Sequence, residues 1–359
     1  MAGNLADIIT CAKFQGENFR AYDFTGGRIS HFRIDFRMGL TTVQRDCAAC
    51  DNVFAVDNTD TIVVSAVNVI HELSVRDSSW ESMGSSWESM GGVTSLGDEL
   101  YILRRYAHKD SDDYVIDVYS KTDFAFLRGF SVPRRSYGIR DITSCTRLDC
   151  LLIADSDGKC LHKVFKDGRN SPEIWPLSEK PYMLSAGRGW DVSVLVSCRR
   201  EGTLSNTIGI IMELNIVGEC VRRIVLQPLM TAFWHAVELS SDEFVIAYRS
   251  CWCARGDIIA IVDNGDKVKQ SYGNWWIPPS ETALLRGASH MAVDSDGFIF
   301  VSDDENSRLV LLNPSLKLVR YIATKKYPRW LHFDQNSRRL FVGHDSNTVS
   351  VLQLSSQDS

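Results

Sequence analysis

Two histidines in the sequence are placed where they could bind a transition metal. His235 and His290 each stand directly before a short apolar run of β-prone residues. Neutral imidazole is a common zinc ligand, and catalytic zinc uses three protein ligands with one open position. No third ligand accompanies the pair: His332 should face another direction, and His344 follows a later strand. A hydrogen bond from each ring to a neighbouring carbonyl is the competing interpretation, so we assign no metal ligand and no catalytic residue.

Three further side chains hold comparable positions. Arg140, Tyr182 and Arg329 lie at, or just before, the start of similar apolar runs. If those runs are the innermost strands of a ring, their first residues gather at one mouth of a central channel, where loops from every unit converge. The predicted ligand-binding residues are therefore Arg140, Tyr182, His235, His290 and Arg329.

Cysteine offers a second kind of metal chemistry. Of the ten cysteines, Cys47 and Cys50 have the spacing of a zinc knuckle or a redox pair, and Cys251 and Cys253 share one face of an extended segment. Neither pair has a second pair of ligands nearby, as structural zinc requires. We expect reduced, mostly buried thiols, while metal binding or oxidation of these two pairs stays open.

A repeated phrase supplies the elements that would position these residues. It consists of a short apolar strand, a polar turn and a second, strongly β-prone strand, and residues 291–302 form its clearest copy. Helical periodicity is scarce. Seven second strands begin 38 to 54 residues apart, at Ile62, Leu100, Leu151, Val194, Val245, Ile299 and Leu340. Such a period is typical of one four-stranded propeller blade.

The expected fold is therefore an all-β propeller of seven four-stranded blades, or six if the phrase at Phe54 or Val93 is irregular. The last phrase has room for only three strands, and an open edge invites aggregation. We expect an N-terminal strand, from a hairpin at residues 18–36, to close the ring. The whole chain would be one domain, with closing strands in residues 1–47, blades in 48–355 and a tail in 356–359.

One segment falls outside the repeat. Residues 78–84, Ser-Ser-Trp-Glu-Ser-Met-Gly, recur letter for letter at 85–91. A tandem copy of this kind is most simply tolerated in an outer strand or a loop. The functional alternative is a ligand-binding lip formed by Trp80, Glu81, Trp87 and Glu88.

Two blades resemble NHL repeats. Residues 289–303, continuing to 306–310, contain Ala-Val-Asp, Asp-Gly, Val-Ser-Asp and Asn-x-Arg, and residues 151–158 match the middle of that motif. The resemblance implies a module for binding protein or RNA, of the kind found beside RING and B-box domains, although no RING pattern is present. Related rings are lyases or lactonases. In the similar peptidyl-hydroxyglycine lyases, Pro-His pairs bind zinc, but no proline precedes His235 or His290.

Composition narrows the function classes. The net charge of −6 argues against a surface built for nucleic acid. No signal-peptide pattern or membrane-spanning apolar run is visible, so we expect a soluble, cytoplasmic protein. The leading hypothesis is a non-enzymatic module that binds a protein or peptide, without a cofactor. A metal-dependent lyase or hydrolase and an RNA-binding propeller are the alternatives, a small-molecule ligand is a further option, and the oligomeric state stays open.

Overall fold

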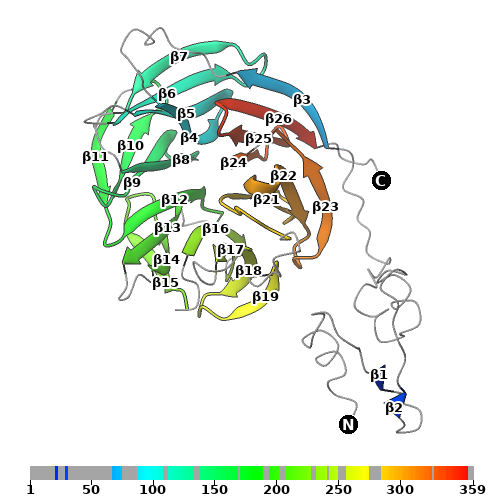
Figure 1. The fold of residues 1–359 in the computed structure, drawn as a ribbon. Helices are drawn as coiled ribbons and strands as arrows, with labels where there is room; N and C mark the ends of the chain where they lie inside the picture. The colour runs from blue at the N-terminus through cyan, green and yellow to red at the C-terminus, as the bar shows by residue number, and fades with distance from the viewer. Residues whose placement is uncertain are drawn as a thin grey trace. The chain divides into compact units, whose positions relative to one another are not determined.

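Six four-stranded antiparallel sheets follow one another around a ring in this computed structural model (Figure 1). Contacts divide the chain into two compact units, Met1–Val63 and Val64–Ser359, and the ring belongs to the second. The structure describes residues 21–22, 29–30, 67–74, 87–107, 112–132, 138–168, 170–188, 194–201, 207–227, 232–240, 242–249, 256–274, 284–325 and 327–354. No helix in these ranges is long and apolar enough to span a membrane.

Each sheet is one blade, and the blades are numbered here in chain order. Blade 1 comprises β4 (Trp87–Leu96), β5 (Glu99–Ala107), β6 (Asp112–Ser120) and β7 (Phe126–Ser131). Blade 2 comprises β8 (Ile139–Cys145), β9 (Cys150–Asp155), β10 (Cys160–Phe165) and β11 (Asn170–Pro176). Blade 3 comprises β12 (Lys180–Ala186), β13 (Val194–Glu201), β14 (Thr207–Leu214) and β15 (Cys220–Val225).

The second half of the ring repeats this pattern. Blade 4 comprises β16 (Ala232–Ser240), β17 (Glu243–Arg249), β18 (Ile258–Asp263) and β19 (Val268–Tyr272). Blade 5 comprises β20 (Met291–Val293), β21 (Ile299–Asp303), β22 (Arg308–Leu312) and β23 (Leu318–Ala323), with the 3-10 turn η4 (Asp304–Asn306) between β21 and β22. Blade 6 comprises β24 (Pro328–Asp334), β25 (Arg339–His344), β26 (Thr348–Leu354) and β3 (Val67–Ser74).

Burial follows the position of a strand within its blade. In β9 and β21 every residue is buried, because both faces of a blade pack against neighbouring blades. This explains why the second strands read as continuous apolar runs rather than as alternating ones. The outermost strands β7 and β15, in contrast, alternate between exposed and partly or fully buried residues, as half-solvated edges do.

Apolar side chains form six buried clusters in the described residues, one at each boundary between adjacent blades. The cluster between blades 6 and 1 includes Leu73 of β3, Trp330 and Met90. The ring is therefore a closed series of equivalent interfaces, and no blade has a core of its own.

The ring is closed by a strand from the N-terminal side, but by a different strand from the expected one. β3 pairs antiparallel with β26 from Thr348↔Ser74 to Leu354↔Val67, so it becomes the outermost strand of the last blade. In the expected hairpin, the described strands β1 (Ala21–Tyr22) and β2 (Ile29–Ser30) pair with each other and not with β26. The prediction of an N-terminal closing strand is correct, and its assignment to residues 18–36 is wrong.

Six blades, rather than seven, make up the ring. The six later second strands each lie where the sequence placed them, from Leu100 in β5 to Leu340 in β25. The phrase at residues 54–65 lies outside the described residues. The next described strand, β3, is the outermost strand of blade 6, and the described residues form six blades. The alternative of six blades is thus confirmed.

The duplicated heptad is also placed differently. Its first copy, residues 78–84, lies outside the described residues, but the second copy enters β4, the innermost strand of blade 1. Met90 is buried at the boundary with blade 6. The expectation of an outer strand or loop is therefore wrong for Trp87–Gly91, because these residues line the centre of the ring.

Candidate anion site at one face of the ring

The strand register brings the predicted residues to one face of the ring. The innermost strand of each blade pairs antiparallel with the next strand outward. The start of the innermost strand therefore lies beside the end of its neighbour. In blade 3 Lys180 pairs with Arg199, and in blade 4 Ala232 pairs with Arg249. Equivalent starts also meet between blades, since the rings of Tyr182 and Trp234 lie 6.3 Å apart. We call this side the entry face.

Four side chains from three consecutive blades form a cluster on the entry face. We call Arg140, Tyr182, Arg199 and Trp234 the mouth cluster. The guanidinium of Arg199 lies 3.5 Å from the ring centroid of Tyr182 and 4.6 Å from that of Trp234. The Arg140 guanidinium lies 5.7 Å from the same tyrosine ring. Two cations therefore share one aromatic wall, an arrangement that favours cation–π contacts but brings like charges together.

Arg199 has few partners for a side chain this enclosed. Its Nε donates a 2.6 Å hydrogen bond to the carbonyl oxygen of Phe233, and its Nη2 is buried without a hydrogen-bond partner. Burial lowers the pKa of Arg199, and the positive charge of Arg140 acts in the same direction. No carboxylate in the described ranges pairs with either guanidinium. Because Arg199 is partly buried and has no carboxylate partner, an anion would be stabilised at the mouth cluster.

Below the mouth cluster, buried side chains fill the centre of the ring. The rings of His235 and His290 are stacked with centroids 4.0 Å apart, and Nε2 of His290 lies 3.5 Å from Oδ2 of Asp141. Asp141 also accepts hydrogen bonds from the backbone N–H groups of Ile142 (2.8 Å) and Leu184 (2.7 Å). All three side chains are nearly inaccessible to solvent, so this layer links blades 2, 3, 4 and 5.

The contacts of the two histidines do not suit metal binding. In His235, Nδ1 accepts a hydrogen bond from the backbone N–H of Met291 (3.0 Å), and Nε2 donates to the carbonyl oxygen of Leu184 (3.2 Å). In His290, Nδ1 accepts from the N–H of Leu331 (3.4 Å), which leaves the proton on the nitrogen that faces Asp141. Burial, and then the neighbouring His290, lower the pKa of His235 well below 6.5, so its ring is neutral. Both rings have the contacts of structural histidines.

Arg329, the fifth predicted residue, is on the entry face but outside the mouth cluster. It is exposed, pairs with Asp345 at 3.1 Å, and lies over the ring of Trp330. Its positive charge also acts on Asp304, whose Oδ1 is buried without a hydrogen-bond partner. Burial raises the pKa of Asp304 to about 7. This part of the face therefore carries carboxylates, in contrast to the mouth cluster.

Sequence reasoning thus found Arg140 and Tyr182, which lie together, and missed Arg199 and Trp234. Arg199 comes from a second strand, whereas the repeat predicts site residues only at the starts of the innermost strands. A signal existed: three charged residues, 199–201, end that mostly apolar strand, and antiparallel pairing with residue 180 carries Arg199 to the same edge.

Among known proteins, the chain is similar only to solved structures, and the similarity concerns the fold. No family model and no curated protein matches the chain. Among solved structures, the chain is similar to "Kuenenia stuttgartiensis Hydrazine Synthase", with a TM-score of 0.51 and 10% identity over 74% of this chain and 95% of that one. A protein of unknown function from Bacteroides caccae has a TM-score of 0.48 and 13% identity, covering 72% and 83% of the two chains. The similarity to the first of these structures shows the propeller fold alone. The resemblance to NHL repeats continues to rest on the residues of two blades.

The pH dependence of stability tests a partly buried histidine, His332. Burial lowers the pKa of His332 to about 4, while its Nε2 lies 2.8 Å from Oγ of Ser95 in blade 1. The unfolded chain binds a proton near pH 6.5, whereas the folded chain does so only near 4. The contribution of His332 to stability is therefore complete above the unfolded pKa and is lost as the pH falls from 6.5 towards 4.

His332→Gln should remove this dependence. The wild-type protein should lose more of its unfolding free energy than the variant between neutral pH and about pH 5. Asp304, whose pKa is raised, contributes with the opposite sign in both proteins, so the comparison cancels it. Urea titrations at the two pH values provide the measurement. Parallel pH profiles for the two proteins would refute the assignment.

Proposed function

We propose that this protein is a recognition module that binds an acidic segment of a peptide or protein on the entry face. A carboxylate of the ligand lies between Arg140 and Arg199, and apolar parts of the ligand pack on Tyr182 and Trp234. The observation that carries the proposal is the partly buried Arg199 side chain, whose guanidinium has one buried, unsatisfied nitrogen and a second cation nearby. A guanidinium fork matches the geometry of a carboxylate, with two parallel hydrogen bonds.

The composition of the cluster supports a protein or peptide ligand. Tyrosine, tryptophan and arginine are the residues most often found at the energetic centres of protein interfaces, where packing excludes water. The mouth cluster is positively charged, whereas the molecule as a whole carries a net charge of −6. An acidic ligand is therefore steered to the mouth cluster rather than to other parts of the surface.

A catalytic function has less support. The two histidines that would have to bind a catalytic metal use their ring nitrogens in hydrogen bonds within the central layer. We propose a non-enzymatic role for the entry face, with a cytoplasmic location and an NHL-like origin of the blades as parts of the same proposal. These parts rest on composition and on the residues of blades 2 and 5.

Binding of labelled peptides tests the proposal. Fluorescence anisotropy would compare a library of short peptides containing glutamate with the same peptides containing glutamine. Acidic peptides should bind, and Arg199→Met should weaken them by about 10- to 100-fold, because a charge-assisted hydrogen bond contributes about 1.5–3 kcal/mol. The affinity of Arg199→Lys for acidic peptides should lie between those of the wild type and Arg199→Met, because lysine retains the positive charge but loses the two parallel hydrogen bonds of the guanidinium.

Arg338→Met is the matched control. Arg338 lies between β24 and β25, at the other end of an innermost strand from the mouth cluster, and it is loosely paired with Asp296 at 3.6 Å. Its replacement should leave peptide affinity unchanged. Equal binding of the glutamate and glutamine peptides, or equal losses in the Arg199 and Arg338 variants, would contradict the proposed function.

A further inference from the structure

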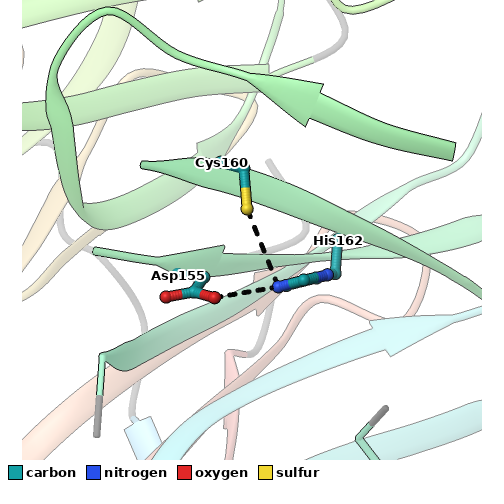
Figure 2. A group of neighbouring side chains, drawn as sticks. All are labelled: Asp155, Cys160 and His162. Atoms are coloured by element: carbon teal, nitrogen blue, oxygen red, sulfur yellow. Dashed lines mark hydrogen bonds and ion pairs between the residues drawn. The ribbon is translucent and has the colours of Figure 1, made fainter. Parts of the chain in front are cut away.

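Three buried side chains with metal-binding atoms converge near the end of β9 (Figure 2). Asp155, Cys160 and His162 come from β9 and β10 and expose 0%, 4% and 4% of their surface. Nε2 of His162 lies 3.0 Å from Oδ2 of Asp155 and 3.7 Å from Sγ of Cys160. Figure 2 shows both side chains directed at this single ring nitrogen. Cys160 forms no disulfide.

This arrangement differs from a catalytic triad. In a triad, the nucleophile and the carboxylate contact opposite nitrogens of the imidazole, so that one nitrogen takes the nucleophile's proton while the carboxylate orients the ring through the other. Here both approach the same nitrogen, which can hold one hydrogen at most. The three potential ligand atoms all lie within 4.8 Å of one another.

Corresponding positions in other blades show what blade 2 adds. In blade 1 a buried pair, Arg104 and Asp117, joins the second and third strands at 2.7 Å. In blade 6 the equivalent pair is His344 and Ser350, at 2.9 Å. These are simple polar links between strands. Blade 2 has a comparable link and adds a thiol, Cys160, on the residue of β10 that pairs directly with the end of β9. In the described part of the chain, this is the one group of three metal-binding side chains.

We propose that Asp155, Cys160 and His162 form a site for a divalent transition metal of the zinc type. Zinc–sulfur and zinc–nitrogen bonds of about 2.3 and 2.0 Å imply a sulfur-to-nitrogen separation of about 3.5 Å in a tetrahedron, and about 3.3 Å from nitrogen to oxygen. The corresponding separations here are 3.7 and 3.0 Å. Thiolate, imidazole and carboxylate together suit zinc and cobalt better than magnesium or calcium. The fourth position is left to water.

Neighbouring groups support the ligand geometry. Oδ1 of Asp155 accepts the backbone N–H of Gly158 at 2.8 Å, which orients Oδ2 towards the histidine. A Cβ atom on Gly158 would lie 2.7 Å from Oδ2 of Asp155 and 3.1 Å from Sγ of Cys160. Glycine therefore keeps open the space between two ligand atoms. When the metal binds through Nε2, the imidazole of His162 carries its single proton on Nδ1 and the thiol proton of Cys160 passes to solvent, so affinity should fall in acid.

Metal content of the purified protein tests the site. The full chain would be stripped with a chelator, reloaded with Zn²⁺ or Co²⁺, freed of excess metal and measured by mass spectrometry of the elements. We expect about one equivalent per chain. The cobalt protein should also show a thiolate-to-cobalt charge-transfer band and the intense visible bands of tetrahedral Co²⁺. Cys160→Ser should abolish the charge-transfer band, and His162→Gln should reduce bound metal at least tenfold.

Two further variants separate ligation from folding. Gly158→Ala keeps all three ligands, and Gly158 is not among the residues with positive φ, so alanine is compatible with its backbone. We expect it to fold and to bind metal at least tenfold more weakly. Cys220→Ser removes an exposed thiol and should change neither metal content nor spectrum. Less than a tenth of an equivalent in the reloaded wild type, or an unchanged cobalt spectrum in folded Cys160→Ser, would overturn the proposal. Neither result depends on peptide binding at the mouth cluster.

Discussion

Deletion of residues 1–75 should abolish the folded ring, whereas deletion of residues 1–63 should leave it intact. The longer deletion removes β3, whose backbone pairs with β26 along seven aligned residue pairs. It also removes Leu73 from the cluster between blades 6 and 1. The exposed edge of β26 would then be free to pair with another molecule. Since each interface supports the next around a closed ring, opening one boundary weakens all of them.

Thermal unfolding followed by circular dichroism, with size-exclusion chromatography, distinguishes the two deletions. The chain starting at residue 64 should give a monodisperse peak and a sharp transition like that of the full chain. The chain starting at residue 76 should aggregate or lose its cooperative transition. A sharp transition at the full-length temperature for both would mean that β3 does not close the ring.

Asp141→Ala should produce the largest loss of stability among single substitutions in the central layer. The carboxylate accepts two buried backbone N–H groups, from Ile142 and Leu184, and lies beside His290. Alanine leaves both donors without an acceptor, and each such loss costs about 1–3 kcal/mol. We therefore expect a decrease of about 3 kcal/mol in the free energy of unfolding, with the effect shared by three blades.

Guanidinium titration of the wild type, Asp141→Ala and Asp296→Ala measures this loss. Asp296 is an exposed aspartate, and its nearest cation lies 3.6 Å away, so its replacement should change stability by less than about 0.5 kcal/mol. If Asp141→Ala proves as stable as Asp296→Ala, the layer of Asp141, His235 and His290 does not hold the blades together.

The repeat made the fold readable from the sequence. Apolar second strands such as Leu100–Leu103 are buried on both faces, and that burial produces the uninterrupted runs from which the blades were recognised. The number of blades was not readable in the same way, because the phrase at residues 54–65 resembles a blade. The strand that follows it pairs with β26, nearly 300 positions further along the chain. Pairing between the two ends of a chain leaves no periodic signal in either of them.

Only those residues of the candidate site that lie at the starts of innermost strands could be predicted from the sequence. Arg140 and Tyr182 follow from the repeat, while His235 and His290 prove to belong to the layer beneath. Arg199 depends on the exact register of β12 and β13, which contains a bulge between Pro181 and Met183. A shift of one residue reverses which face a side chain occupies, so composition and spacing cannot place such a residue.

Photo-cross-linking tests the central claim, that the mouth cluster receives an acidic ligand, most directly. A peptide with a photoreactive group beside its glutamates would be activated in complex with the protein, and the adducts located by mass spectrometry. The account predicts adducts on segments containing Tyr182 or Trp234, reduced in Arg199→Met and unchanged in Arg338→Met. Adducts concentrated on the turns between first and second strands, at the other end of the ring, would contradict it.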